Sequence, residues 1–141
     1  MEKLSKSMEQ YLETIYEIER DGRTPTVSDI ADAKCVRLPS VTYVLRKLSK
    51  PDRGLVNYER YSREVTLTAR GRAIAERLEK THATLKWFFE MIGLDSEIAN
   101  DDACEIEHIV RPATVDKLTG FVEWVQNNAK ASKLLSEYQS Q

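Results

Sequence analysis

Three side chains with metal-binding chemistry stand close together in the second half of this chain. Cys104, Glu107 and His108 occur at spacings of three and four residues. On a helix, this spacing places all three side chains on one face. A thiolate, a carboxylate and an imidazole on one face make part of a site for a divalent transition metal. One helix cannot complete a coordination sphere, so we expect further ligands from other elements.

Each of these residues, taken alone, is also compatible with ordinary packing. A single cysteine is more often a small buried hydrophobe than a ligand. His82 and His108 could each be a hydrogen-bonded core histidine. The shared spacing of the cluster favours a metal site. By softness, its thiolate favours Fe(II), Co(II), Ni(II) or Zn(II) over Mn(II).

The composition is that of a soluble globular protein with one domain or two small ones. The 141 residues are 41% hydrophobic and 31% charged. No apolar run reaches membrane-spanning length, and the first residues lack the apolar core of a signal peptide. The two cysteines, Cys35 and Cys104, lack the spacing of a paired motif, which argues against a disulfide framework. We expect a cytoplasmic protein without membrane contact.

Charge is distributed unevenly along the chain. The formal net charge is −2, yet residues 35–75 carry nine basic and three acidic side chains. That segment is therefore +6 and the remainder is −8. A basic segment in an acidic chain is typical of a module that meets phosphate. A solvated basic face explains the charge alone equally well.

The basic segment begins within a group of three predicted helices. Residues 5–21 show the periodicity of an amphipathic helix, and shorter helices are expected from residue 27 to about 34 and from residue 38 to 48. Thr26 and Asp29 have the spacing of a capping box, and Pro39 falls in the first turn of the third helix. The second and third helices predict a helix-turn-helix, although many helical hairpins match this pattern.

Two runs of alternating hydrophobicity follow the third helix. Residues 55–59 and 64–68 predict strands, joined by a basic and aromatic tip at residues 60–63. A β-hairpin in this place defines a winged helix-turn-helix, whose recognition helix enters the major groove while the wing reaches the backbone or the minor groove. The expected DNA-binding residues are Arg37, Pro39, Ser40, Thr42, Tyr43, Arg46, Lys47, Arg60 and Arg63.

The remainder of the chain is predicted to be helical. Helices are expected at residues 68–92, from residue 95 to before Pro112, at 113–127 and at 129–138. The helices after residue 93 are too few to bury their apolar faces alone, which predicts a two-fold homodimer. Such a dimer suits a palindromic operator in double-stranded DNA. The predicted fold is mainly α, with a winged helix-turn-helix DNA-binding domain at residues 1–72 and a helical metal-binding and dimerisation domain at 73–141.

Several short motifs occur together in one known family of regulators. They lie at residues 7–16 in the first helix, 27–31 in the second, 39–42 in the recognition helix, 67–71 after the wing, 92–95, and in the Cys-x-x-Glu-His cluster. Through them the chain resembles the diphtheria toxin repressor and manganese transport regulator family over nearly its whole length. It lacks the SH3-like domain of the longer iron-responsive members, so its architecture resembles the short, manganese-type branch.

The resemblance implies ligands that the spacing of the cluster does not reveal. The family takes one ligand from its first helix, at the position of Gln10, where relatives have Met or Asp. A glutamine can coordinate only through its neutral carbonyl oxygen. Glu13 and His82 match a second metal position of the family.

The resemblance also implies a hybrid site. Cys104 matches the iron-type members, whereas manganese-type members place a glutamate there. Lys86 stands where the iron branch has an acidic ligand, and Asn100 stands where it has a histidine. The ancillary site of that branch is therefore expected to be altered in this chain.

The resulting hypothesis is a metal-activated, sequence-specific transcriptional repressor that controls genes of metal uptake. Its expected ion is Mn(II) or Fe(II), with Co(II), Ni(II) or Zn(II) as alternatives, and its ligand set is Cys104, Glu107, His108, Gln10, Glu13 and His82. A winged-helix regulator that needs no metal is the alternative. A metal-dependent hydrolase is disfavoured, because the chain has two histidines and no His-Glu-x-x-His pair, nucleophile elbow or glycine-rich phosphate loop.

Overall fold

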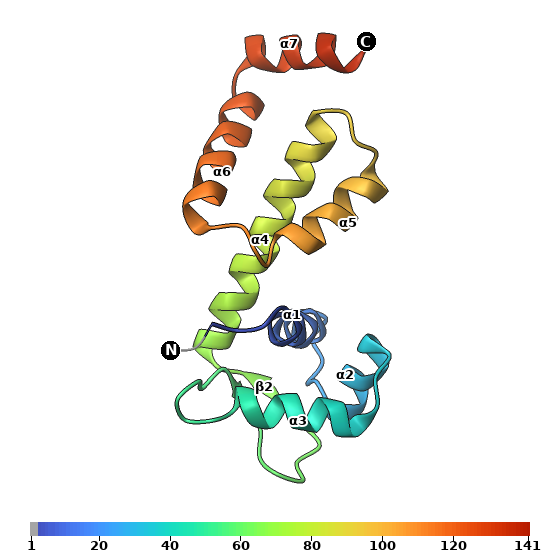
Figure 1. Cartoon of the computed structure of the whole chain (residues 1–141), viewed down its shortest axis with the longest axis vertical. Coiled ribbons are helices and arrows are strands. Elements are labelled where there is room, and N and C mark those ends of the chain that lie inside the picture. The colour runs from blue at the N-terminus through green and yellow to red at the C-terminus, as the bar shows by residue number, and fades with distance from the viewer. Residues whose placement is uncertain (1–2) are drawn as a thin grey trace. The chain divides into compact units, whose positions relative to one another are not determined.

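The computed structural model describes residues 3–141 and divides into two compact units, with the division between Arg77 and Leu78 (Figure 1). The first unit contains α1 (Lys6–Arg20), α2 (Val27–Lys34), α3 (Leu38–Leu48), β1 (Val56–Asn57) and β2 (Thr66–Leu67). The long helix α4 (Ala69–Met91) begins in the first unit and continues into the second, which also contains α5 (Ser96–Ile106), α6 (Pro112–Gln126) and α7 (Ala129–Gln139). This order of elements confirms the predicted mainly α fold with a small two-stranded wing.

Helix α1 forms the centre of the first unit's core. Leu12 and Ile15 on its apolar face are completely buried. Ile30 of α2 and Leu45 of α3 are buried in the same cluster. Burial of side chains of this size contributes roughly 1.5–3 kcal/mol each. Because α1, α2 and α3 share one core, the orientation of α1 is coupled to that of the other two helices.

The connection between α2 and α3 has the geometry of a helix-turn-helix. The predicted capping box is confirmed: the Asp29 N–H donates to Thr26 Oγ1, and the Thr26 N–H donates to Asp29 Oδ2, each at 3.1 Å. Cys35 ends α2 in the left-handed region, with φ of 55°. Pro39 lies in the first turn of α3, where the missing N–H costs little.

The wing differs from its prediction, because its two strands pair over only two residues each. Val56 faces Leu67 and Asn57 faces Thr66 in the antiparallel register. The outer part of the second run pairs elsewhere: the Val27 N–H donates to the Arg63 carbonyl at 2.9 Å, and the Val65 N–H donates to the Pro25 carbonyl at 3.0 Å. The segment before α2 therefore takes the place of a longer first strand and ties the wing to the helix-turn-helix.

Helix α1 is also bonded directly to the wing. Glu19 accepts the Leu67 N–H at 2.9 Å through Oε1, and its Oε2 forms an ion pair with Arg72 at the start of α4. A charged acceptor makes these bonds stronger than neutral ones. Within the first unit, α1 thus contacts both parts of the predicted DNA-binding surface.

The second unit contains a further departure from prediction. Helix α5 ends at Ile106 rather than continuing to Pro112, so His108 lies beyond the helix. Pro112 begins α6 and favours an extended conformation for Arg111 before it, so the chain has to leave the helical path before Arg111. The Glu107 N–H still donates to the Ala103 carbonyl at 2.9 Å, so Glu107 keeps the helical direction while the chain turns.

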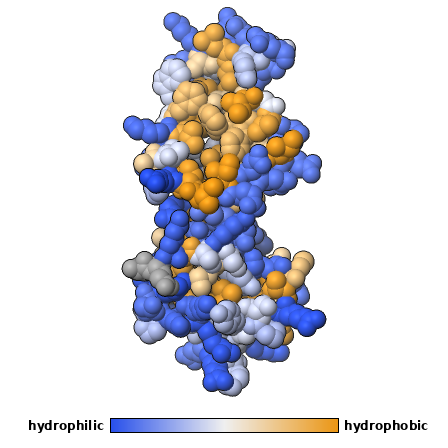
Figure 2. All heavy atoms as spheres, viewed as in Figure 1, coloured by the Kyte–Doolittle hydropathy of each residue, from blue (hydrophilic) through white to orange (hydrophobic). Residues whose placement is uncertain are grey.

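The surface of the second unit is rich in apolar side chains (Figure 2). The large exposed ones include Ile109, Phe121, Trp124, Leu134 and Tyr138. Helix α7 has no fully buried residue in the single chain. Within residues 3–141, no helix combines the length and the apolar character that crossing a membrane requires.

Candidate metal centre and nucleic-acid interface

In the second unit, α4, α5 and the turn that follows α5 bring four of the predicted metal ligands together. His82 of α4 places its Nδ1 atom 2.9 Å from Glu107 Oε2 and 3.7 Å from Cys104 Sγ. On the other oxygen of the same carboxylate, His108 Nε2 lies 3.3 Å from Glu107 Oε1. The Glu107 carboxylate therefore lies between the two histidines of the chain.

The burial of these side chains differs in a way that suits a metal centre. The side chains of Glu107 and His108 are only 3% and 2% exposed, whereas His82 is 23% exposed and Cys104 is exposed. A carboxylate buried beside two imidazoles needs positive charge nearby to offset its loss of hydration. Protonated histidines or a cation can both provide that charge.

The distances between the donor atoms test whether a metal fits this cluster. Metal bonds to nitrogen, oxygen and sulfur are about 2.0–2.3 Å long, so two donors on one ion lie roughly 3.0–3.7 Å apart in tetrahedral or octahedral geometry. The separations of 3.3 and 3.7 Å fall in this range and that of 2.9 Å lies just below it, although His82 and His108 face different oxygens of the Glu107 carboxylate. The donor set of one thiol, one carboxylate and two imidazoles suits a divalent transition ion.

The two predicted ligands on the first helix belong to the first unit. Gln10 and Glu13 both lie on α1 and are half-buried. The backbone carbonyl of Gln10 accepts a hydrogen bond from Thr14 Oγ1 at 3.0 Å, so this bond does not involve the Gln10 side chain.

The two positions that depart from the iron-branch ancillary site have other partners here. Lys86 Nζ lies 3.7 Å from Glu90 Oε1, one turn further along α4. Asn100 of α5 places Oδ1 3.0 Å from His82 Nε2, on the side of the ring away from Glu107. Sequence reasoning flagged Asn100 only as a departure and missed this contact, because the packing of α5 on α4 cannot be inferred from spacing.

In the first unit, the exposed face of α3 carries most of the predicted DNA-binding side chains. Arg37 precedes the helix as its N-cap, Pro39, Ser40, Tyr43 and Arg46 are exposed, and Thr42 and Lys47 are half-buried. The Lys47 ammonium lies 4.5 Å from the centre of the Tyr43 ring, and its hydrogen bond and charge lower the pKa of the Tyr43 phenol. These side chains form a polar and basic surface, as a recognition helix requires.

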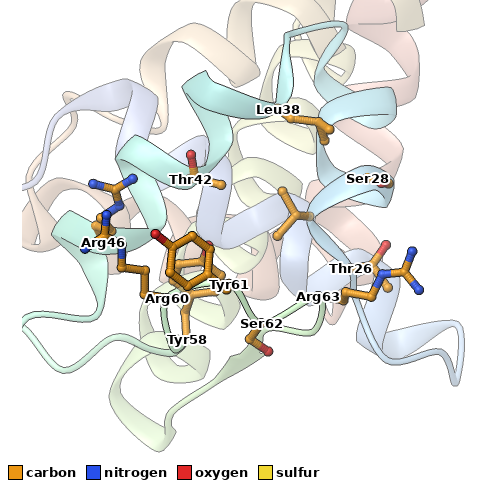
Figure 3. Close-up of a pocket in the computed structure, with 11 residues that line it drawn as sticks. Thr26, Ser28, Leu38, Thr42, Arg46, Tyr58, Arg60, Tyr61, Ser62 and Arg63 are labelled. Atoms are coloured by element: carbon orange, nitrogen blue, oxygen red, sulfur yellow. The ribbon is translucent and has the colours of Figure 1, made fainter.

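A groove of about 590 Å³ separates α3 from the wing (Figure 3). Thr42 and Arg46 line it from α3, and Arg60 and Arg63 line it from the wing. Arginine on both sides of this groove is suited to a phosphate backbone.

Tyr61 at the wing tip was not among the predicted DNA-binding residues. Its side chain is 85% exposed, and its backbone is left-handed with φ of 69°. The Arg60 guanidinium lies 5.0 Å from the centre of its ring. A bulky residue rarely adopts this conformation, so the tip holds an aromatic ring in solvent at a cost of about 1–3 kcal/mol. The signal in the sequence was an aromatic residue within a basic turn.

Comparison with known proteins gives two matches to one family. Residues 3–63 match the N-terminal DNA-binding domain of the iron dependent repressors, and residues 68–133 match their metal-binding and dimerisation domain. The chain belongs to the iron-dependent repressor family. The repressor is 36% identical to the HTH-type transcriptional regulator MntR of Bacillus subtilis over 133 aligned residues. The alignment covers 94% of this chain and 92% of that protein. It is 38% identical over 133 residues to MntR of Shouchella clausii, covering 94% and 91%.

Solved structures show the same fold. The manganese regulator SloR aligns with a TM-score of 0.68 at 25% identity, over 83% of the repressor and 54% of that longer chain. The hypothetical protein SSo2273 from Sulfolobus solfataricus aligns with a TM-score of 0.69 at 24% identity, over 84% and 89% of the two chains.

Family membership makes this chain a metal-dependent, DNA-binding transcriptional repressor of metal homeostasis. The family description of residues 68–133 includes dimerisation, and the exposed apolar side chains of α6 and α7 are those expected of a subunit interface. Its partners are therefore DNA and a second copy of the chain.

Proposed function

We propose that this repressor senses cytoplasmic Mn(II) or Fe(II) and, with the ion bound, represses genes of metal uptake. The observation that carries the proposal is the Glu107 carboxylate, whose two oxygens face His82 at 2.9 Å and His108 at 3.3 Å, with the Cys104 thiol beside His82. This cluster gathers nitrogen, oxygen and sulfur donors around one buried carboxylate, and such donors suit a divalent transition ion.

Two considerations bear on the identity of the ion. The relatives over nearly the full length are MntR regulators, and SloR is a manganese regulator, which favours Mn(II). The Cys104 thiolate favours Fe(II), or else Co(II), Ni(II) or Zn(II), since soft ligands prefer these ions to manganese. We therefore propose Mn(II) or Fe(II) as the physiological ion, with Co(II), Ni(II) and Zn(II) as ions that compete for the same site.

We propose that Gln10 and Glu13 add oxygen ligands from α1, as the family resemblance implies. Bound metal supplies positive charge and fixed bond directions. If α1 contributes ligands, metal binding fixes the orientation of this helix. Within the first unit, α1 shares a core with α2 and α3 and holds the wing through Glu19. Metal would therefore favour one arrangement of the DNA-binding surface. Because the ion binds that arrangement more tightly than the others, metal binding drives the switch.

We propose that the DNA target is a palindromic operator. A homodimer presents two α3 helices related by two-fold symmetry, so two half-sites of the same sequence should be contacted. The contacts are assigned to the exposed side chains of α3 and to Arg60 and Arg63 of the wing. A duplex that carries such a site can be obtained by selection from random-sequence DNA in the presence of Mn(II).

Replacement of both wing arginines should weaken binding to the selected duplex without changing which sequence is preferred. Arg60→Ala combined with Arg63→Ala removes two phosphate contacts from each subunit, and so four from the bound dimer. The slope of log affinity against log salt concentration should become less steep by about four, because each neutralised phosphate releases roughly one counterion. Fluorescence anisotropy at several salt concentrations measures this slope.

The matched control is the pair Lys130→Ala and Lys133→Ala, which removes two basic side chains from α7. That variant should keep the wild-type slope, since α7 is not assigned to DNA. Equal slopes for the wing variant and the wild type would refute the assignment of Arg60 and Arg63 to phosphate.

A further inference from the structure

The two nitrogens of the His82 ring face different partners. Nδ1 faces the candidate ligands, at 2.9 Å from Glu107 Oε2 and 3.7 Å from Cys104 Sγ. Nε2 faces Asn100 Oδ1 at 3.0 Å. Helix α4 supplies the histidine, and α5 supplies the asparagine and the cysteine. His82 is therefore held between a ligand cluster on one side and a neutral amide on the other.

The Asn100 amide oxygen favours a ring hydrogen on Nε2, whereas the Glu107 carboxylate favours one on Nδ1 as long as no ion occupies that side of the ring. Oδ1 of asparagine carries no hydrogen and only accepts, so Nε2 of His82 must be the donor in this contact. A neutral imidazole with its hydrogen on Nε2 has its lone pair on Nδ1. That lone pair is directed at the side of the ring where Glu107 and Cys104 lie.

We propose that Asn100 is a positioning residue for the metal centre: it holds His82 in the Nε2–H tautomer and fixes Nδ1 as the metal-binding atom. The inference rests on the proposed metal-sensing function. Asn100 itself makes no bond to the ion in this arrangement. The position that supplies a histidine ligand in the iron branch thus acts here from outside the coordination sphere.

The physical advantage lies in orientation and tautomer selection. A metal-ligating histidine usually donates its other N–H to an oxygen, which fixes the ring and the tautomer, and loss of such a partner costs about 10–100-fold in metal affinity. Without Asn100, the ring is free to place its hydrogen on Nδ1, where Glu107 Oε2 is an available acceptor at 2.9 Å. That tautomer blocks the nitrogen that faces the other ligands.

The tautomer can be measured directly by nitrogen-15 NMR of the histidine rings in the full-length protein. The chain has only two histidines, so a spectrum of His108→Gln assigns the His82 signals. In metal-free wild-type protein, Asn100 and Glu107 compete for the hydrogen of a neutral His82 ring, so we expect a larger Nε2–H fraction than in Asn100→Ala. After loading with cadmium-113, we expect one-bond cadmium–nitrogen coupling at Nδ1 of His82 and a retained hydrogen on Nε2.

Two substitutions separate positioning from a general effect on folding. Asn100→Ala should shift the metal-free tautomer towards Nδ1–H and lower Cd(II) affinity by about 10–100-fold. Asn100→Asp keeps an oxygen acceptor at the same distance and should restore both the Nε2–H tautomer and the affinity. Asn127→Ala, which removes an asparagine hydrogen bond to the Glu123 carbonyl on α6, should leave both unchanged.

The outcomes distinguish this inference from the function on which it rests. An Asn100→Ala protein with the wild-type His82 tautomer and unchanged Cd(II) affinity would overturn the role of Asn100 alone. Cadmium coupling at Nε2 of His82 in the wild type would overturn it as well. Wild-type protein that binds no Cd(II) would instead overturn the metal-sensing function.

Discussion

Replacement of Glu107 by glutamine should abolish the response of DNA binding to metal. The amide side chain would occupy nearly the same volume as the carboxylate but would carry no charge between His82 and His108, which lie 2.9 and 3.3 Å from the two carboxylate oxygens. Loss of an outer-sphere partner already costs about 10–100-fold in metal affinity, so loss of this ligand should exceed that range. Isothermal titration calorimetry with Mn(II), and anaerobically with Fe(II), measures the change.

The matched control for this substitution is Glu97→Gln. Glu97 lies in the first turn of α5 and is exposed, so the same chemical change at that residue should leave metal affinity within a few-fold of the wild type. The DNA affinity of the Glu107→Gln protein should equal that of the wild type without metal. Wild-type metal affinity in the Glu107→Gln protein would show that the cluster is structural.

The substitution with the largest expected effect on stability is Gly71→Ala. Gly71 lies in the first turn of α4, and a Cβ atom there would meet the Leu55 carbonyl oxygen at 2.0 Å. That carbonyl cannot move away easily, because it accepts the Thr68 N–H at 3.1 Å. Overpacking against backbone should lower the free energy of unfolding by about 3 kcal/mol or more. Urea unfolding followed by circular dichroism, at fixed protein concentration, measures the loss.

Gly120→Ala provides the opposite expectation for the same chemical change. Gly120 lies inside α6 with no atom within 4 Å of its added Cβ. Alanine in a helix interior is favoured over glycine by about 1 kcal/mol, so this variant should be slightly more stable than the wild type. A Gly71→Ala protein as stable as the wild type would mean that α4 does not approach the segment after α3 so closely.

Local signals predicted the helices of this chain well. The Thr26–Asp29 capping box and Pro39 in the first turn of α3 are both determined by residues within one turn of each other. The wing was predicted less well, since its outer residues pair with the segment before α2. That pairing joins Val65 to Pro25, and no local pattern contains it.

The candidate site shows the same division. The spacing of Cys104, Glu107 and His108 predicted a cluster, but it also predicted a helix through His108, which the turn before Pro112 prevents. His82 entered through family resemblance, and its approach to Glu107 depends on how α4 and α5 pack. The contact between Asn100 and His82 depends on the same packing, so spacing along one helix could not reveal it.

The central claim is that metal and DNA binding are coupled, and one anisotropy measurement tests it most directly. Wild-type protein is titrated into the selected duplex under anaerobic conditions, once with a chelator and once with excess Mn(II) or Fe(II). A coupling free energy of about 1–3 kcal/mol predicts DNA affinity that is roughly 5–150-fold higher with metal. Equal affinity under the two conditions would contradict the claim and would indicate a winged-helix regulator that needs no metal.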